Sequence, residues 1–138
     1  MLEWSPRGGV LSRSGSVYAG YPSQTMEKEL IYHFCARSDW DAAASSYVAD
    51  SLATQGFIHC SPLDHVHVSA TERAAGRTDL VVLEIDEALL DPPAVWEDGD
   101  PPHPTGKQFP HVYGPIPVTA VVSVREIKPE ADGTFAPL

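Results

Sequence analysis

Short runs of β-forming residues, separated by turns that contain glycine and proline, are the feature of this sequence that most constrains its fold. The clearest run is DLVVLEI at 79–85, whose apolar and β-branched residues predict a strand. Comparable runs predict strands at LIYHFC (30–35), FIHC (57–60), AVWE (94–97), Phe109 to Tyr113 and Pro117 to Ile127. The Gly114-Pro115 pair between the last two runs suits a bend or a hairpin.

Two helices are predicted between these strands. Ser38 is a good N-cap, and the acidic residues that follow it favour the first turn of a helix through the alanine-rich AAASS at 42–46. Ser61-Pro62 suits the N-cap and first position of a second helix, over Pro62 to Ala75, which Gly76 would end. Five or six strands with two helices predict a small α+β fold.

The length of 138 residues favours one domain. Residues 1–29 are rich in Ser, Gly and Pro without a sustained hydrophobic period, so we expect a flexible N-terminal extension there. We expect the globular domain over residues 30–128 and a C-terminal tail over 129–138. Sheet edges near Pro110 allow a weak dimer, so a monomer or a weak dimer is expected.

Charge and composition exclude several classes of partner. The chain has 9 Lys and Arg against 19 Asp and Glu, which argues against binding to nucleic acid or to an anionic membrane. No apolar run approaches the roughly 20 residues that span a bilayer, and residues 1–20 lack the apolar core of a signal peptide. A cytoplasmic location is therefore expected. Cys35 and Cys60 are too few for a disulfide framework and are predicted to be small buried hydrophobes.

The motif GFIHCSPLDHVH at 56–67 carries the first set of candidate functional residues. A helix that begins at Ser61-Pro62 presents free backbone N–H groups suited to an anion, and His59 ends the strand that leads to it. His65 lies in the first helical turn and Ser69 one turn later on the same face. Alternatively, Ser61 only caps the helix and His59 is a half-buried, hydrogen-bonded ring.

A metal site at this motif is not expected. His65-x-His67 lies near His59 and Cys60, but residues i and i+2 of a helix do not face each other. No acidic residue stands at a matching spacing, and there is no Cys-x-x-Cys pair. We therefore predict no metal and no certain cofactor.

The motif FPHVYGPIP at 109–117 carries the second set. Side chains alternate along a strand, so Phe109, His111 and Tyr113 share one face and could form a pocket wall for a planar ligand. Alternatively, this is a half-exposed aromatic face, because Pro110 requires an edge strand or a bulge. Glu97, beside Trp96, could be an acid of raised pKa or a hydroxyl binder, or simply a solvated carboxylate.

In this order, IYHFC, GFIHCS, VVLEID, WE and FPHVYGPIP resemble the domain-of-unknown-function 952 family, over Leu30 to Lys128. That family is grouped with the ADP-ribosyltransferase superfamily. The resemblance implies a compact, mixed or antiparallel split β-sheet with a cleft able to hold NAD, ADP-ribose or a similar nucleotide. The matched positions point to a site formed by His59, Ser61, Glu97, His111, Tyr113 and Gly114.

This sequence departs from the family pattern at several of the expected site positions. His65 stands where Gln is usual, Ser69 where Thr is usual, and His33 where Lys or Arg is frequent. An extra loop, Asp98 to Lys107, separates Glu97 from the FPHVYG motif. The ligand could therefore differ from that of other members.

If the ligand is NAD, the resemblance implies a role for each part of the site. Backbone N–H groups of residues 61–63 would hold the pyrophosphate, and His59 would bind a ribose hydroxyl. Tyr113 or Phe109 would stack on nicotinamide, while Glu97 would stabilise the developing ribosyl cation. A net charge of −10 disfavours a pyrophosphate unless Arg37, Arg73 or Lys107 turns inward, so a smaller or less charged ligand stays open.

These observations predict an enzyme that acts on a small molecule in a histidine-lined cleft, a transferase or hydrolase with NAD as a candidate substrate. Alternatives are a non-catalytic nucleotide- or metabolite-binding module, and a metabolite lyase, cyclase or hydrolase that does not use NAD. The predicted catalytic residues are His59, His65, Glu97 and His111. The predicted ligand-binding residues are Tyr32, His33, Ser61, Ser69, Phe109, Tyr113 and Gly114.

Overall fold

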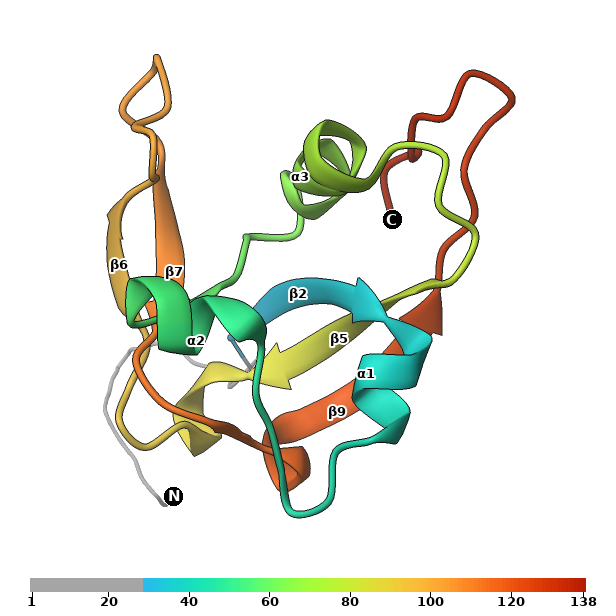
Figure 1. Cartoon of the computed structure of the whole chain (residues 1–138). Helices are drawn as coiled ribbons and strands as arrows, with labels where there is room; N and C mark the ends of the chain where they lie inside the picture. Colours follow the sequence, from blue (N-terminus) through green and yellow to red (C-terminus); the bar gives the residue numbers. More distant parts are fainter. Residues whose placement is uncertain (1–28) are drawn as a thin grey trace, which may run out of the picture.

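A computed structural model of the chain describes residues 29–138 (Figure 1). The extension predicted for residues 1–29 thus falls, apart from Glu29, outside the described residues. A three-stranded antiparallel sheet lies at the centre, with β5 (Leu80–Asp86) between β2 (Leu30–Ala36) and β9 (Val121–Glu126). All seven residues of β5 are buried, so the segment with the clearest strand pattern is the centre of the fold.

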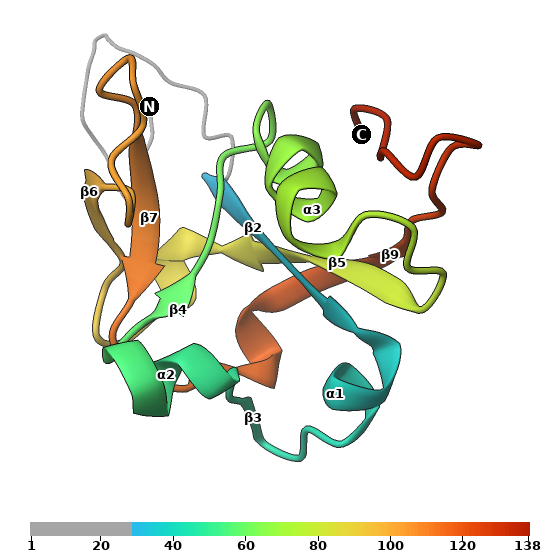
Figure 2. The same ribbon diagram turned by 45° about the horizontal axis from the view of Figure 1, so that its top comes forward.

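A second antiparallel sheet of three strands stands beside the first and supplies one wall of the candidate site (Figure 2). Its order is β4 (Ile58–His59), β7 (Gln108–Val112) and β6 (Val95–Asp98). A further pair joins β3 (Ser46–Tyr47) to β8 (Ile116–Pro117). The antiparallel pairing and the few helices confirm the predicted α+β class.

The helices differ from the prediction of two. The described residues contain three α-helices, α1 (Arg37–Asp41), α2 (Asp50–Gln55) and α3 (Val66–Ala74), and two 3-10 helices, η2 (Glu87–Leu89) and η3 (Val118–Ala120). The first helix does not continue through the alanine-rich AAASS. The two serines that end this segment instead pair with β8 and the residue after it. Ser46 pairs with Pro117, and the backbone N–H of Val118 donates to the carbonyl of Ser45 at 3.0 Å.

The start of α3 also corrects the prediction. The helix begins at Val66 rather than at Pro62, with His65 at the N-cap. Ser61 instead bridges to β2, since its N–H donates to the carbonyl of Tyr32 at 2.7 Å and its carbonyl accepts from the N–H of Tyr32 at 2.9 Å. The Ser61 N–H is therefore not available to an anion, as the helix start at Ser61-Pro62 would have required.

Alternation along the central strands produces a hydrophobic core on each face of the sheet. One cluster packs Leu83 and Ile85 against Ile58 and Val112, and so joins the central sheet to the second one. The other packs Val82 against Ala70 of α3 and against residues of the C-terminal segment.

Residues 129–138, which the sequence sets apart as a tail, lie against α3 (Figure 1). Phe135 is 5% exposed, and its N–H donates to the hydroxyl of Thr71 at 2.9 Å. Gly76 follows the helix with φ +81°, and its N–H donates to the carbonyl of Gly133 at 2.9 Å. The C-terminal segment thus helps to hold α3, and α3 is one wall of the candidate site.

Candidate functional site

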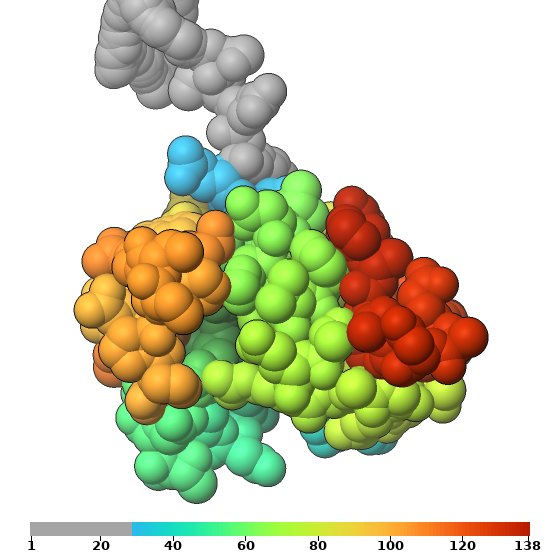
Figure 3. All heavy atoms as spheres, turned by 90° about the horizontal axis from the view of Figure 1, so that it is seen from above, coloured from blue at the N-terminus to red at the C-terminus, as the bar shows by residue number. Residues whose placement is uncertain are grey.

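A cavity of about 310 Å³ opens between α3 and the β6–β7 hairpin (Figure 3). Its floor comes from β2, β4 and the residues after β4, and its two walls come from α3 and from β7 with the hairpin loop. Segments far apart in the sequence therefore meet around one hollow. The principal lining residues are Tyr32, His33, Phe34, His59, Cys60, Ser61, His65, Ser69, Glu72, Arg73, Asp100, His103, Phe109 and His111.

Most of the predicted site residues line this cavity, including the three histidines His59, His65 and His111. Three do not. Glu97 lies behind His111 and Tyr113 is 44% exposed at the end of β7, so neither is among the lining residues. Gly114 packs under Pro92, where an added Cβ would lie 3.3 Å from the proline ring, and it too is outside the cavity.

A carboxylate orients the imidazole of His111. In the β6–β7 ladder Glu97 pairs with Phe109 and Val95 with His111, so Glu97 and His111 are diagonal neighbours on one face. The Nδ1 of His111 lies 2.8 Å from Glu97 Oε1, which also accepts the hydroxyl of Tyr113. These hydrogen bonds, first from Tyr113 and then from His111, hold the pKa of Glu97 below its usual range.

The consequence for His111 is a defined tautomer. An ionised carboxylate only accepts, so Nδ1 carries the proton and Nε2 keeps a lone pair when the ring is neutral. The ring of Phe57 stacks on His111 with centroids 4.1 Å apart and fixes its orientation. Among residues 29–138 no hydrogen bond reaches Nε2, and the ring lines the cavity. His111 thus presents a base to whatever occupies the hollow.

His59 stands directly opposite His111 in the β4–β7 ladder, with ring centroids 5.6 Å apart. Its Nε2 donates to Gln55 Oε1 at 2.7 Å, which leaves a lone pair on Nδ1. Burial, and then the positive charge of Arg73, lower the pKa of His59 to about 4. Near neutral pH the ring is therefore uncharged.

His65 stands at the rim of the cavity. Its ring contacts His103 of the hairpin loop at 5.4 Å and Phe109 at 4.9 Å between centroids. Burial, followed by the proximity of His103, lowers the pKa of His65. The N-terminal end of α3 and the hairpin loop thus meet through an aromatic contact at the mouth.

His33 contributes a wall rather than a free polar group. Its Nδ1 donates to the carbonyl of His59 at 2.6 Å, and its Nε2 accepts the hydroxyl of Tyr47 at 2.9 Å. Both ring nitrogens therefore have protein partners. Burial lowers the pKa of His33, which keeps the ring neutral and this arrangement intact.

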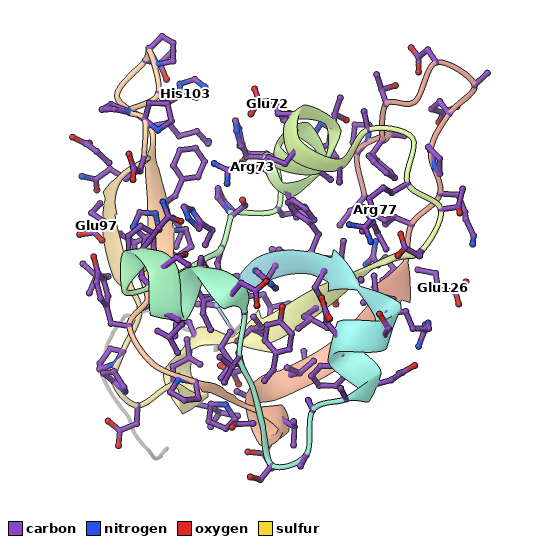
Figure 4. All side chains as sticks on the ribbon, in the orientation of Figure 1. Glu72, Arg73, Arg77, Glu97, His103 and Glu126 are labelled. Carbon is purple, nitrogen blue, oxygen red and sulfur yellow. The ribbon has the colours of Figure 1, made fainter. Side chains whose placement is uncertain are left out.

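Arg73 is a candidate functional residue that is absent from the catalytic and ligand-binding residues predicted from the sequence. Of the three cations considered for an inward position, Arg37 pairs with Glu126 at 3.2 Å and Lys107 with Asp64 at 3.3 Å. Arg73 instead lines the cavity and points from α3 toward the hairpin (Figure 4). The signal was present in the sequence, since His65, Ser69 and Arg73 follow one another at intervals of four residues on one helix face.

Other chemistry is limited within residues 29–138. No group of three or more His, Cys, Asp or Glu side chains there is arranged to hold a metal ion, and no helix there is long and apolar enough to cross a membrane. Cys35 and Cys60 are free and buried, as predicted. Burial raises the pKa of Cys35 to about 11 and also raises that of Cys60, so neither thiol is activated as a nucleophile.

Comparisons with known proteins identify relatives. No curated protein matches the chain. The crystal structure of protein CC0527 from Caulobacter crescentus is 29% identical, with a TM-score of 0.70 over 78% of this chain and 94% of that one. The solution NMR structure of the same protein is 30% identical, with a TM-score of 0.64 over 76% of this chain and 90% of that one. The family model described as "Protein of unknown function (DUF952)" matches residues 34–124, more than half of the chain, and the chain therefore belongs to the DUF952 family.

Proposed function

We propose that the chain is an enzyme that acts on a small molecule bound in the histidine-lined cavity, with His111 as its general acid–base group. The observation that carries the proposal is the hydrogen bond of 2.8 Å between His111 Nδ1 and Glu97 Oε1. A carboxylate on one ring nitrogen fixes the tautomer and stabilises the imidazolium that forms when the other nitrogen takes a proton.

The reaction class that suits this arrangement is group transfer to water or to a hydroxyl. Nε2 of His111 accepts the proton of the attacking oxygen as that oxygen bonds to the substrate, and the same proton then passes to the leaving group. Glu97 touches His111 and not the cavity, so it acts as a positioning residue. This differs from the direct contact with a ribosyl cation that the resemblance implied for Glu97.

The more specific form of the proposal is ribosyl transfer or hydrolysis with NAD or ADP-ribose, in a protein of the ADP-ribosyltransferase-like superfamily. Its support is Phe109, whose ring lines the cavity and could stack on a planar base. A volume of about 310 Å³ is near the lower end for ligand pockets, which span roughly 300–1,000 Å³. That volume favours a ligand smaller than a whole dinucleotide.

Ligand binding is the first test. We would screen NAD, ADP-ribose, AMP and nicotinamide by thermal shift and calorimetry, on the unmodified chain and on His59→Ala. Saturable stabilisation by NAD or ADP-ribose that His59→Ala abolishes would support the nucleotide form. No response at millimolar concentration would remove that form and direct the search to smaller metabolites.

Catalysis is tested separately with any ligand that binds. Glu97→Gln keeps the size of the side chain but removes the negative charge beside His111 Nδ1, so we expect kcat to fall about 100-fold with Kd unchanged. Glu126→Gln is the control, because Glu126 is an exposed carboxylate on the other side of the molecule from Glu97 (Figure 4). Binding without any turnover in the unmodified chain would instead favour a non-catalytic binding module.

A further inference from the structure

Arg73 differs from every other basic residue in the part of the chain that the structure describes. Arg37, Arg77, Lys107 and Arg125 each pair with a carboxylate, and Lys128 donates to the carbonyl of Thr78. No hydrogen bond or ion pair joins Arg73 to residues 29–138, although acidic residues outnumber basic ones 19 to 9 in the sequence. A guanidinium that has no partner within residues 29–138 of so acidic a protein, and that lines a cavity, is placed to meet an anion from outside.

Two serine hydroxyls line the same side of the cavity. Ser69 lies one helical turn before Arg73, and its Oγ is 3.4 Å from the Oγ of Ser61, which is 7% exposed. Each hydroxyl has one proton to donate, and their mutual hydrogen bond uses only one of the two. One O–H donor therefore stays available to a ligand beside the guanidinium.

The rest of the lining is apolar or negatively charged. Phe34, Phe109 and the prolines at 101, 102 and 104 provide apolar surface, which suits a ring or a short hydrocarbon part. The carboxylates of Glu72 and Asp100 also line the cavity and would repel a second anionic group. The lining thus favours a ligand with one anionic group and one apolar part.

We infer that Arg73, Ser69 and Ser61 bind the single anionic group, a carboxylate or a phosphate monoester, of a small substrate whose apolar part lies against Phe34 and Phe109. The inference rests on the proposed function in taking this cavity as the substrate site, and it adds the substrate class. With the anion at α3, the rest of such a molecule extends toward β7 and His111, across the cavity.

The test compares three aromatic probes of similar size, which are benzoate, phenyl phosphate and uncharged benzamide. We would measure their Kd by calorimetry for the full chain, for Arg73→Gln and for Arg77→Gln. Arg73 is an exposed side chain, so its replacement is not expected to disturb folding. Arg77→Gln is the matched control because it removes the same charge from a residue that pairs with Asp79 and lies outside this cavity (Figure 4).

We expect at least one of the two anions to bind more tightly than benzamide. Arg73→Gln should raise the Kd of that anion about tenfold or more, and Arg77→Gln should change the Kd less than twofold. Which anion binds better distinguishes a carboxylate from a phosphate monoester. Equal binding of benzamide, no binding of either anion, or an unchanged Kd in Arg73→Gln would each overturn the inference.

The outcomes separate this inference from the proposed function. If anion binding depends on Arg73 but the protein has no turnover, the anion-binding inference is supported and the proposed enzymatic function is contradicted. If turnover depends on Glu97 but anion binding does not depend on Arg73, the proposed enzymatic function is supported and the anion-binding inference is contradicted.

Discussion

At the scale of single residues, the protonation state of His59 depends on the positive charge of Arg73 in α3. Its pKa of about 4 reflects burial first and the positive charge of Arg73 second. Both effects disfavour the imidazolium, so removal of either one raises the pKa. Because the pKa of His59 depends on the charge of Arg73, measuring that pKa shows whether the guanidinium lies near the cavity in solution.

We therefore predict that Arg73→Gln raises the pKa of His59 from about 4 toward the ordinary value of about 6.5. The ring nitrogens report this pKa in a pH titration followed by NMR. Arg77→Gln serves as the control, since Arg77 is not among the charges that act on His59. An identical His59 titration in Arg73→Gln and the unmodified chain would place the guanidinium away from the cavity.

Residue-level prediction succeeds where alternation along one strand decides the outcome. Alternation predicts one face shared by Phe109, His111 and Tyr113. The first two line the cavity, whereas Tyr113 at the end of β7 does not. Residue-level prediction fails where a partner distant in the sequence decides. Nothing in GFIHCS shows that Gln55 and Asp100 stand beside His59, or that Tyr47 occupies the second nitrogen of His33.

At the scale of elements, most strands were predictable because their apolar and β-branched runs carry a local signal. The run from Pro117 to Ile127 is an exception, because residues 118–120 form η3 and the strand β9 begins only at Val121. The helix start at Ser61-Pro62 was wrong because the same dipeptide also suits an extended segment, and the N–H of Ser61 pairs with Tyr32 in β2. The short α2 was missed altogether. Its six residues contain no hydrophobic period, and only Gly56 at φ +91° marks its end.

The C-terminal segment should be necessary for the stability of α3. Phe135 is 5% exposed in the cluster that contains Ala70 of the helix, so Phe135→Ala is predicted to lower the free energy of unfolding by about 3 kcal/mol. Urea denaturation measures this change. Leu89→Ala is the control, because Leu89 is 52% exposed and should cost less than about 0.5 kcal/mol. Equal effects of the two substitutions would mean that 129–138 does not pack on α3.

The hairpin loop should matter to ligand binding and little to folding. Asp98 pairs with Gln108 at the end of the β6–β7 ladder, so residues 99–107 can be replaced by the two-residue turn Asn-Gly. The shortened chain loses the exposed Lys107–Asp64 pair, which contributes at most about 1 kcal/mol, and keeps both core clusters.

The same shortening removes the loop part of one cavity wall, including Asp100 and His103, and keeps Phe109 and His111 of β7. We predict that the unfolding midpoint in urea changes little while the Kd of the better-binding probe anion rises several-fold. Unchanged affinity in the shortened chain would mean that the ligand does not touch the loop.

At the scale of the whole molecule, the site lies where two sheets and one helix meet, and each contributes a histidine. His33 comes from the central sheet, His59 and His111 from the second sheet, and His65 from the start of α3. The folded state holds His59, His65 and His33 neutral, and burial is the largest cause in each case. The free energy of unfolding should therefore depend on pH below about 6.5, where these histidines take up protons in the unfolded chain and not in the folded one.

The direction of that dependence follows from proton uptake. The unfolded chain binds a proton at His59 near pH 6.5, whereas the folded chain binds it only near pH 4, so the free energy of unfolding falls as the pH drops through this interval. We expect a loss on the order of 1 kcal/mol from His59 between pH 7 and pH 5, reduced from the full effect because the ring is partly solvated. Urea denaturation at the two pH values measures it, and His59→Gln should make the dependence shallower. If the His59→Gln chain loses as much stability between pH 7 and pH 5 as the unmodified chain, then the fold does not hold the His59 ring neutral.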